Sequence, residues 1–461
     1  MIGDLAAPNY TGDLGDGLVC RWSTAADADK IGGFLGLVWR PNADAPPHPR
    51  AVTETRMYMS GDFSFMGPGD FALVEDKGLP GHPIVAAACF WRHRWSFAGI
   101  EFGVGRPENV ATDPAYRNRG LVRALFAMHH ARSAAEGHLM QAITGIPYFY
   151  RQFGYEYVLD LGGHRTTYLP LIPNKNEGEA ERYTLRLATV DDLPLIQQLY
   201  DQGRSNSLVW HEASAAYWRH RIGFWHDPAL NDQDPQTVPL NTRYLIIVHQ
   251  EYGSCGFMSL AAKRWGSDLE IYNLEVTPQV DLVTALPPLL RLLRDVGEAT
   301  PYVGTEGEPL GQLMWLFGRH HPVYALLGEE LAPRYEPPYA WYIRVPDLLA
   351  FLQLITPVLN ERLARSVFAT YTGEITCDLY PNGLLFKIER GRLVGIDPWR
   401  PPPYDPAASM GCPSLVFLQL LLGYRNIQEL SAIYPDVSVA EKYKLLVATL
   451  FPKQQSQVHP L

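Results

Sequence analysis

The chain has 461 residues, of which 47% are hydrophobic and 19% charged, with a formal net charge of −10 at pH 7. This length allows about three domains of ~150 residues, and the composition is typical of a folded globular protein. The acidic balance argues against nucleic-acid binding. No uninterrupted apolar stretch approaches the ~20 residues that cross a bilayer, which argues against a membrane protein.

The cysteines and the first residues predict a reducing compartment. The five cysteines lie far apart with no C-x-x-C pair, and Met1 to Tyr10 lacks a basic start followed by an apolar run. We therefore expect reduced thiols in a cytoplasmic protein without a signal peptide. The pairs His129–His130 and His320–His321 are sequence neighbours, which point about 100° apart on a helix, so we predict no metal site.

An aromatic run precedes the most informative segment. Phe90 to Phe97 reads FWRHRWSF. In a strand, alternation places Trp91, His93, Trp95 and Phe97 on one face. A strand of this kind either packs in a core or lines a pocket, and we favour packing.

Residues 110–122 predict an anion site. They read VATDPAYRNRGLV: an apolar strand end, a short basic loop, and the start of an amphipathic helix that continues through Leu125 and Met128. The first N–H groups of a helix have no intrahelical partner and attract anions, Gly120 allows close approach of the backbone, and Arg117 and Arg119 add positive charge. We predict a pyrophosphate here; the alternative is an ordinary surface loop with solvated arginines.

Other phosphate motifs fit this segment poorly. The pattern G-x-x-x-x-G-K-[ST] of a P-loop is missing, and Gly103 and Gly105 alone are a weak dinucleotide fingerprint that precedes the strand. The loop instead resembles the acetyl-CoA loop of the GNAT acetyltransferase superfamily, Q/R-x-x-G-x-G/A after a strand. Here it reads Arg117 to Val122, with Val122 in place of the final Gly or Ala.

A second segment strengthens this resemblance. Residues 145–155 read GIPYFYRQFGY and follow a predicted strand at Leu139 to Thr144. In GNAT enzymes the tyrosine four residues before a Gly-aromatic pair faces the sulfur of CoA, which implies this role for Tyr150, with Gly154–Tyr155 as the pair. A leaving thiolate needs a proton, and a tyrosine hydroxyl with a reference pKa near 10 can donate one at neutral pH.

A linker and an internal repeat divide the chain. Pro173 to Arg182 is polar and turn-rich, as expected between domains. Beyond it, Arg186 to Ile196 reads RLATVDDLPLI and repeats the pattern of Arg21 to Ile31, RWSTAADADKI, in which a Thr or Asp can cap a helix. The second copy has a strand-like run at Leu269 to Val276, but no basic, glycine-rich loop follows it. We therefore expect a duplicated domain that has lost cofactor binding.

The last third of the chain has a different pattern. A helical segment over Val345 to Ala364 is broken by Pro357, and we expect strands at Phe368–Tyr371, Ile375–Tyr380 and Leu384–Glu389. The segments Leu415–Leu422 and Glu441–Leu450 are helical in period. These elements predict an α+β domain.

The order of the three parts resembles the Eis (enhanced intracellular survival) acetyltransferase family. The resemblance implies a mixed α/β and α+β chain: a catalytic GNAT domain over residues 1–172, a degenerate GNAT-like domain over 183–342, and a sterol-carrier-protein-like domain with a C-terminal tail over 343–461. It also implies acetyl transfer from acetyl-CoA to primary amines, such as aminoglycosides, polyamines or lysine side chains, and assembly into a hexamer.

The resemblance also implies roles for individual residues. Tyr150 is the expected general acid, and the carboxylate of Leu461 is expected beside it, although a frayed tail is the alternative. Trp22, Phe34 and Trp39 are candidates for the acceptor site, with core packing as the alternative. The residues expected to hold acetyl-CoA are Val110, Ala111, Thr112, Arg117, Asn118, Arg119, Gly120, Leu121, Val122 and Gly145. The rival hypothesis is a non-catalytic protein that senses CoA or carries a lipid.

Overall fold

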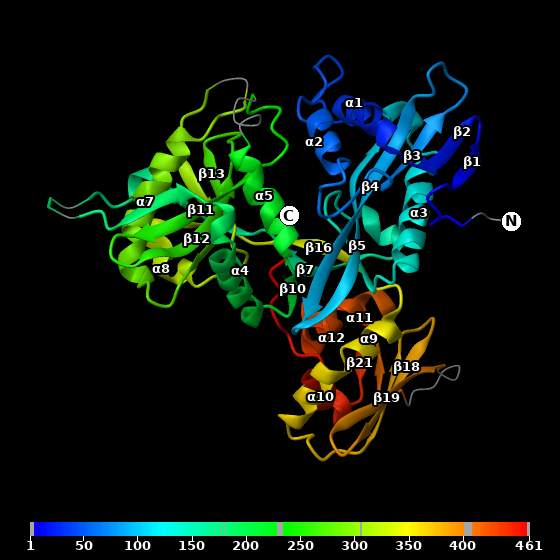
Figure 1. Cartoon of the computed structure of the whole chain (residues 1–461). Coiled ribbons are helices and arrows are strands. Elements are labelled where there is room, and N and C mark those ends of the chain that lie inside the picture. The colour runs from blue at the N-terminus through cyan, green and yellow to red at the C-terminus, as the bar shows by residue number, and fades with distance from the viewer. Residues whose placement is uncertain are drawn as a thin grey trace.

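The computed structural model describes residues 4–175, 177–178, 180–227, 234–304, 307–400 and 408–458. These residues form three bodies, each built on its own sheet (Figure 1). Among them, no helix has both the length and the apolar character needed to cross a membrane.

The first body is a mixed sheet in the order β1-β2-β3-β4-β5-β6-β16-β7, with β10 paired to β4. Its strands are β1 (Thr11–Gly15), β2 (Leu18–Trp22), β3 (Phe71–Asp76), β4 (Ile84–Phe97), β5 (Ile100–Thr112), β6 (Met140–Ile143), β7 (Glu156–Leu161), β10 (Val209–His211) and β16 (Tyr339–Arg344).

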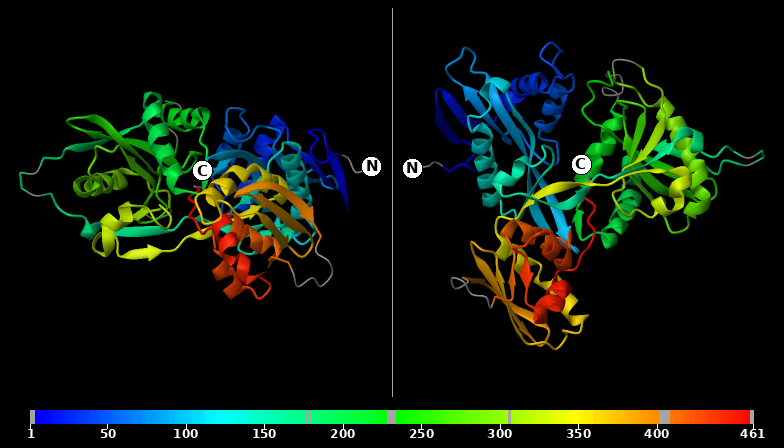
Figure 2. Two further views of the ribbon diagram at one scale, coloured as in Figure 1. Left: turned by 90° about the horizontal axis from the view of Figure 1, so that it is seen from below. Right: turned by 180° about the vertical axis from the view of Figure 1, so that it is seen from behind.

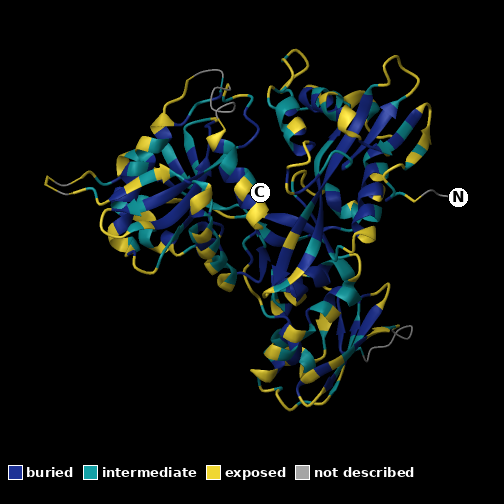
Figure 3. Ribbon diagram, in the orientation of Figure 1, coloured by how far each residue is buried: buried dark blue, intermediate teal, exposed yellow. Residues whose placement is uncertain are grey.

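Strand alternation assigns the two faces of this sheet to different helices. Phe71 and Leu73 of β3 pack with α1 (Ala28–Val38) and α2 (Ala51–Tyr58), whereas Ala72 and Val74 pack with α3 (Leu121–Ala135). The predicted alternation at the end of β4 is confirmed, because Trp91, His93, Trp95 and Phe97 are all buried. Trp91 packs in the α1–α2 core, whereas Trp95 and Phe97 pack in the core that contains Trp341 and Phe351. Figure 3 shows the long β4–β5 hairpin as a mostly buried ribbon.

The second body repeats this plan. Its sheet has the order β15-β8-β14-β13-β12-β11-β9, in which β13 and β14 are parallel neighbours as β5 and β6 are in the first sheet. Its elements are β8 (His164–Tyr168), β9 (Tyr183–Leu187), α4 (Leu193–Gln202), α5 (Ala215–Gly223), β11 (Thr242–His249), β12 (Gly253–Ala261), β13 (Asp268–Val276), α7 (Leu282–Ala299), β14 (Gln312–Trp315), α8 (Val323–Leu331) and β15 (Arg334–Glu336).

The two bodies exchange strands: the first sheet takes β10 and β16 from the second body, and the second sheet takes β8 from the first. β8 lies before the linker in sequence yet pairs with β14 and β15, and β16 returns from the end of the second body to pair between β6 and β7 (Figure 2). The sheets therefore cross the predicted boundaries at 172/183 and 342/343. A strand pattern shows which face is buried but not which neighbour a strand pairs with, so the sequence did not reveal this exchange.

The internal repeat corresponds to the same local structure in both bodies. Arg21 Nη2 contacts Asp27 Oδ1 at 2.8 Å, and Arg186 Nη2 contacts Asp192 Oδ1 at 2.6 Å. Each aspartate also accepts the backbone N–H of the threonine three residues earlier, at 2.7 Å from Thr24 and 2.8 Å from Thr189. The paired arginine and the N–H group thus fix the turn before α1 and before α4.

The third body combines a sheet in the order β19-β18-β17-β20-β21 with short helices. Its elements are α9 (Leu348–Leu354), α10 (Thr356–Ala364), β17 (Gly373–Asp378), β18 (Gly383–Glu389), β19 (Arg392–Trp399), β20 (Met410–Gly411), α11 (Ser414–Leu421), α12 (Ile427–Ile433), β21 (Ser438–Val439) and α13 (Lys444–Leu450). The predicted strand at Phe368–Tyr371 is wrong: Tyr371 N–H donates to Phe368 O in a turn, and the two rings pack against the core.

Candidate active site

The basic loop and the start of α3 form an open helix N-terminus. Gly120 is the N-cap, with φ 77°, and a Cβ built on it would meet no atom within 4 Å. The first helical bond runs from Ala124 N–H to Gly120 O at 3.1 Å. The N–H groups of residues 121–123 therefore have no intrahelical partner, and no side chain caps them.

The side chains of this loop leave the helix start accessible. Arg117, Asn118 and Arg119 are exposed, and no ion pair among the described residues involves the two arginines. Asn118 has φ 63°, so two left-handed residues turn the backbone just before the helix. The predicted strand, basic loop and helix are all present, and this geometry suits an anion.

A gap opens in the first sheet directly beside this loop. β5 pairs with β6 only at Val104–Met140 and Gly105–Gln141, although β5 continues to Thr112. The register of β4 and β5 also shifts between Ala87 and Cys89, where Asn109 has φ 52°. The last part of β5, which holds the predicted residues Val110 to Thr112, consequently has no strand partner on its β6 side. The Thr112 hydroxyl is buried and makes no hydrogen bond.

Tyr150 lies against this gap. It belongs to a short 3-10 helix over Phe149–Phe153, is 3% exposed, and packs against Phe126 of α3 and Tyr342 of β16. Val110 and Val122 pack against the same cluster, so the structure brings the strand end, the helix start and Tyr150 together. A Cβ on Gly145, whose φ is 112°, would lie 3.9 Å from the Tyr150 hydroxyl oxygen.

The environment of Tyr150 keeps its hydroxyl protonated. Burial raises the pKa of Tyr150, and the negative charge of Glu108 raises it further. Among the described residues, none forms a hydrogen bond with this hydroxyl. The group is therefore available as a proton donor to something that enters the gap.

Arg106 holds Glu108 on the face of β5 opposite to the cluster around Tyr150. The Glu108 Oε2 and Arg106 Nη2 atoms are 2.6 Å apart, and the Arg106 guanidinium lies 4.9 Å from the ring centroids of both Trp91 and Trp341. Arg106 and Glu108 are two residues apart in a strand, so they share a face. The sequence analysis missed this pair, although the alternation could have indicated it.

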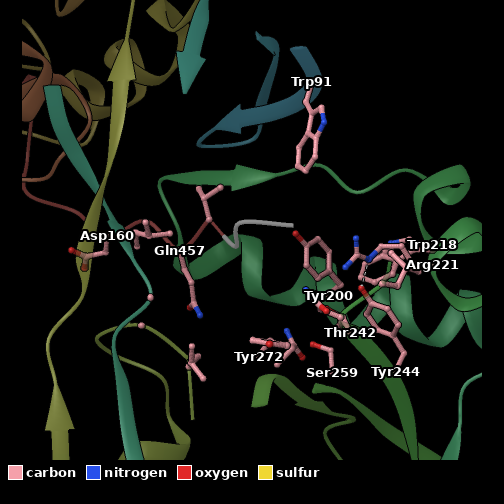
Figure 4. Close-up of a pocket in the computed structure, with 18 of the residues that line it drawn as sticks. Trp91, Asp160, Tyr200, Trp218, Arg221, Thr242, Tyr244, Ser259, Tyr272 and Gln457 are labelled. Carbon is pink, nitrogen blue, oxygen red and sulfur yellow. Dashed lines mark hydrogen bonds between the residues drawn. The ribbon is translucent and has the colours of Figure 1, made fainter. Parts of the chain in front are cut away.

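A cavity of about 550 Å³ lies on the same side as Trp91, between the first and second bodies (Figure 4). The first body contributes Glu54, Tyr58 and Trp91, and the second body contributes side chains from α4, α5 and β11 to β13. The second body's lining includes Tyr200, Trp218, Arg221, Tyr244 and Tyr272. No sequence motif marked these residues, because they converge only when the two bodies meet.

The C-terminal tail also borders the cavity. Gln455 to Val458 line it, Asp160 of β7 bridges to Gln457, and Val458 O accepts a hydrogen bond from Trp341 Nε1 at 3.0 Å. Leu461, for which a role beside Tyr150 is predicted, lies outside the described residues. Its role stays a prediction.

The three predicted acceptor residues do not line this cavity. Trp22 is 2% exposed and packs on the α3 side, where the Arg132 guanidinium lies 3.8 Å from its ring centroid. This burial favours the packing alternative for Trp22, and its contact with substrate stays a prediction. Phe34 packs in the α1–α2 core and Trp39 against His48, and a contact with substrate stays a prediction for both.

The comparison with protein families gives a match within the first body. Residues 52–158 match the family model described as "Acetyltransferase (GNAT) domain". This range contains α2, the β4–β5 hairpin, the open start of α3 and Tyr150. Among proteins with curated descriptions, none matches the chain.

Solved structures match the chain over its whole length. A GCN5-related N-acetyltransferase from Anabaena variabilis has a TM-score of 0.65 at 12% identity, covering 96% of this chain and 99% of that one. A probable N-acyltransferase from Enterococcus faecalis has a TM-score of 0.62 at 13% identity, covering 95% and 97%. Eis1 from Mycobacterium abscessus has a TM-score of 0.53 at 12% identity, covering 95% and 98%. At these identities the likeness shows a shared fold.

Proposed function

We propose that this chain, whose residues 52–158 match a GNAT acetyltransferase domain model, transfers an acetyl group from acetyl-CoA directly to a primary amine. The observation that carries the proposal is the placement of the buried, unpartnered Tyr150 hydroxyl against the same gap as the open start of α3. An anion site alone fits a CoA sensor equally well. A proton donor held beside it is what a transfer reaction requires.

The residues around the gap fit acetyl-CoA, which supplies the activated acetyl group. The N–H groups at the start of α3 and the side chains of Arg117 and Arg119 would hold the pyrophosphate. The unpaired end of β5, from Val110 to Thr112, offers backbone groups and the buried Thr112 hydroxyl to the pantetheine arm. Gly145, Asn118 and Leu121 shape the same opening.

Tyr150 would act as the general acid. Because burial and the charge of Glu108 raise its pKa, the hydroxyl is protonated at neutral pH and can donate its proton to a leaving thiolate. The amine would approach from the cavity on the Trp91 side, which Glu54 lines. The neutral amine would attack the thioester carbonyl, the C–S bond would break, and the proton lost by the nitrogen would replace the one that Tyr150 gives to the thiolate.

The direct test is release of free thiol from acetyl-CoA in the presence of a panel of primary amines, with the acetylated product identified by mass spectrometry. The proposal predicts amine-dependent thiol release and an acetyl group on the amine nitrogen. Binding of acetyl-CoA without product from any amine would contradict the proposal and favour a sensor.

The hexamer implied by the family resemblance is part of the same proposal, and sedimentation analysis measures it.

A further inference from the structure

The second body places a buried positive charge on the wall of the cavity. Arg221 lies on α5, is 8% exposed and lines the cavity together with Tyr200 and Trp218. Its guanidinium group lies among the aromatic side chains that face this space (Figure 4). An arginine keeps its charge at all physiological pH values, and a charge removed from water is costly unless an opposite charge compensates it.

Among the residues that the structure describes, the partners of Arg221 are neutral. Its Nε donates to the Tyr244 hydroxyl at 2.9 Å, and its guanidinium carbon lies 5.3 Å from the Tyr217 ring centroid. Its two terminal nitrogens donate to none of the described residues, and no ion pair among those residues includes Arg221. Four donor positions on these nitrogens are therefore left for a ligand.

The other buried arginines of the described chain show that this is unusual. Each of them has either a carboxylate partner or backbone carbonyl acceptors: Arg106 with Glu108, Arg132 with Asp70, Arg291 with Glu181, and Arg264 with the carbonyls of Gly266 and Glu308. Arg221 has a single phenol oxygen in their place. A planar guanidinium group with free paired donors matches the geometry of a carboxylate.

The first body contributes a carboxylate to the cavity wall, that of Glu54, whose Oε2 lies 3.7 Å from Arg50 Nε. Glu54 lies on α2 and accepts the Tyr58 hydroxyl at 2.7 Å. Glu54 and Glu108 both lie close enough to Cys89 for their charges to raise the pKa of its thiol, in addition to the effect of burial. The cavity is also lined by aromatic rings, namely Tyr58, Trp91, Tyr200, Trp218, Tyr244 and Tyr272.

We propose that Arg221 binds a carboxylate of the acceptor, so that the preferred acceptor is a primary amine with an aromatic or apolar body and a carboxylate remote from the amine. This inference rests on the proposed acetyl transfer for the amine end, but the carboxylate site is independent of catalysis. Arg221 would hold the acceptor by its far end, the aromatic rings would enclose the body, and the amine would face Glu54 and the gap beside Tyr150.

The first experiment measures binding alone. Calorimetry with 3-phenylpropanoate, which has the ring and the carboxylate but no amine, should show binding to the unaltered enzyme. Binding should weaken roughly 10- to 100-fold in Arg221→Met, the range expected when a charge-assisted pair to a carboxylate is lost. The matched control is Arg219→Met, which removes the same charge from an exposed position on α5 and should bind as the unaltered enzyme does. Absence of binding, or equal binding by Arg221→Met, overturns the proposal.

The second experiment measures selectivity. With the unaltered enzyme, the KM for 4-(aminomethyl)benzoate should be lower than that for benzylamine by a similar factor. Arg221→Met should remove this difference, and the control Arg219→Met should retain both the difference and the kcat with benzylamine. If the Met variant does not fold, Arg221→Lys keeps the charge without the planar pair of donors and should narrow the difference. Equal KM values for the two amines in the unaltered enzyme overturn the proposal. Binding that depends on Arg221 without any acetyl transfer would reject the proposed function and leave the carboxylate site standing.

Discussion

The start of α3 in the first body and the start of α7 in the second body occupy equivalent places, after β5 and β13 respectively, yet they are built differently. Gly120 begins α3 without any capping side chain, whereas the Asp281 carboxylate accepts the Val283 N–H of α7 at 3.0 Å. The Asp281 carboxylate takes one N–H group at the start of α7 and places a negative charge there, which disfavours a phosphate. One duplicated fold thus has one uncapped helix start, where we propose the anion site, and one capped helix start.

The tyrosines beside the two sheets differ in the same sense. The Tyr150 hydroxyl forms no hydrogen bond with a described residue, while the Tyr324 hydroxyl donates to Trp315 O at 2.6 Å and accepts Phe317 N–H at 3.0 Å. A hydroxyl that satisfies two backbone groups holds the loop after β14 in place. In the first body, the N–H groups at the start of α3 and the Tyr150 hydroxyl are available to a ligand. In the second body, the Val283 N–H and the Tyr324 hydroxyl form hydrogen bonds within the chain.

The largest expected effect comes from Tyr150→Phe. Loss of a positioned general acid lowers the rate by about 10²- to 10⁴-fold. The affinity for CoA should change little, because the phenyl ring keeps its packing against Phe126 and Tyr342 and the hydroxyl bonds to none of the described residues. The matched variant Tyr324→Phe should leave kcat unchanged and destabilise the fold by about 1–3 kcal/mol, since it leaves buried backbone groups unsatisfied. Steady-state kinetics and thermal unfolding measure both. Near-normal kcat in Tyr150→Phe, with chemistry rate-limiting, would assign the acid role elsewhere.

Next in size is Gly120→Val. A side chain there projects into the open space at the helix start and should weaken CoA binding about 10- to 100-fold, the range for losing charge-assisted hydrogen bonds. The left-handed φ also imposes strain on any L residue, about 1–2 kcal/mol. Gly137→Val is the control for that strain, because Gly137 has φ 72° and open space at the other end of α3. Equal CoA affinity in the two variants, measured by calorimetry, would show that Gly120 is needed only for the left-handed backbone conformation.

The repeated arginine–aspartate pair should make a similar, pH-dependent contribution to stability in the two bodies. Hydrogen bonding to Arg21 lowers the pKa of Asp27, and hydrogen bonding to Arg186 lowers the pKa of Asp192. A lowered pKa contributes stability that is present above the unfolded value of about 3.9 and is lost as the pH falls through the folded value. Asp27→Asn and Asp192→Asn should each cost about 1–3 kcal/mol at pH 7 and progressively less below about pH 4. Urea unfolding at pH 7 and pH 3 checks this; a cost that does not depend on pH contradicts it.

The smallest effect is expected for Asp281→Ala. Removal of an N-cap side chain should destabilise the chain by about 0.5–2 kcal/mol, without any change in CoA affinity or kcat. A second CoA site in this variant would show that the Asp281 carboxylate alone prevents CoA from binding to the second body.

The sequence predicted the parts of the site that are local. The strand, basic loop and helix around Gly120, and Tyr150 four residues before Gly154, are contiguous in the chain, and the structure places them as expected. The exchange of β8, β10 and β16 and the convergence of Arg221 with Trp91 depend on contacts between distant segments. Local propensity and periodicity carry no information on such contacts. The strand predicted at Phe368–Tyr371 failed because two aromatic residues in a tight turn have the same composition as a short strand.

The central claim is that only the first body binds the cofactor. Calorimetric titration of the full chain with CoA tests it most directly. The account predicts one CoA per chain, a stoichiometry retained in Asp281→Ala and an affinity sharply reduced in Gly120→Val. Two CoA molecules per chain, or a single site that is unaffected by Gly120→Val, would contradict it.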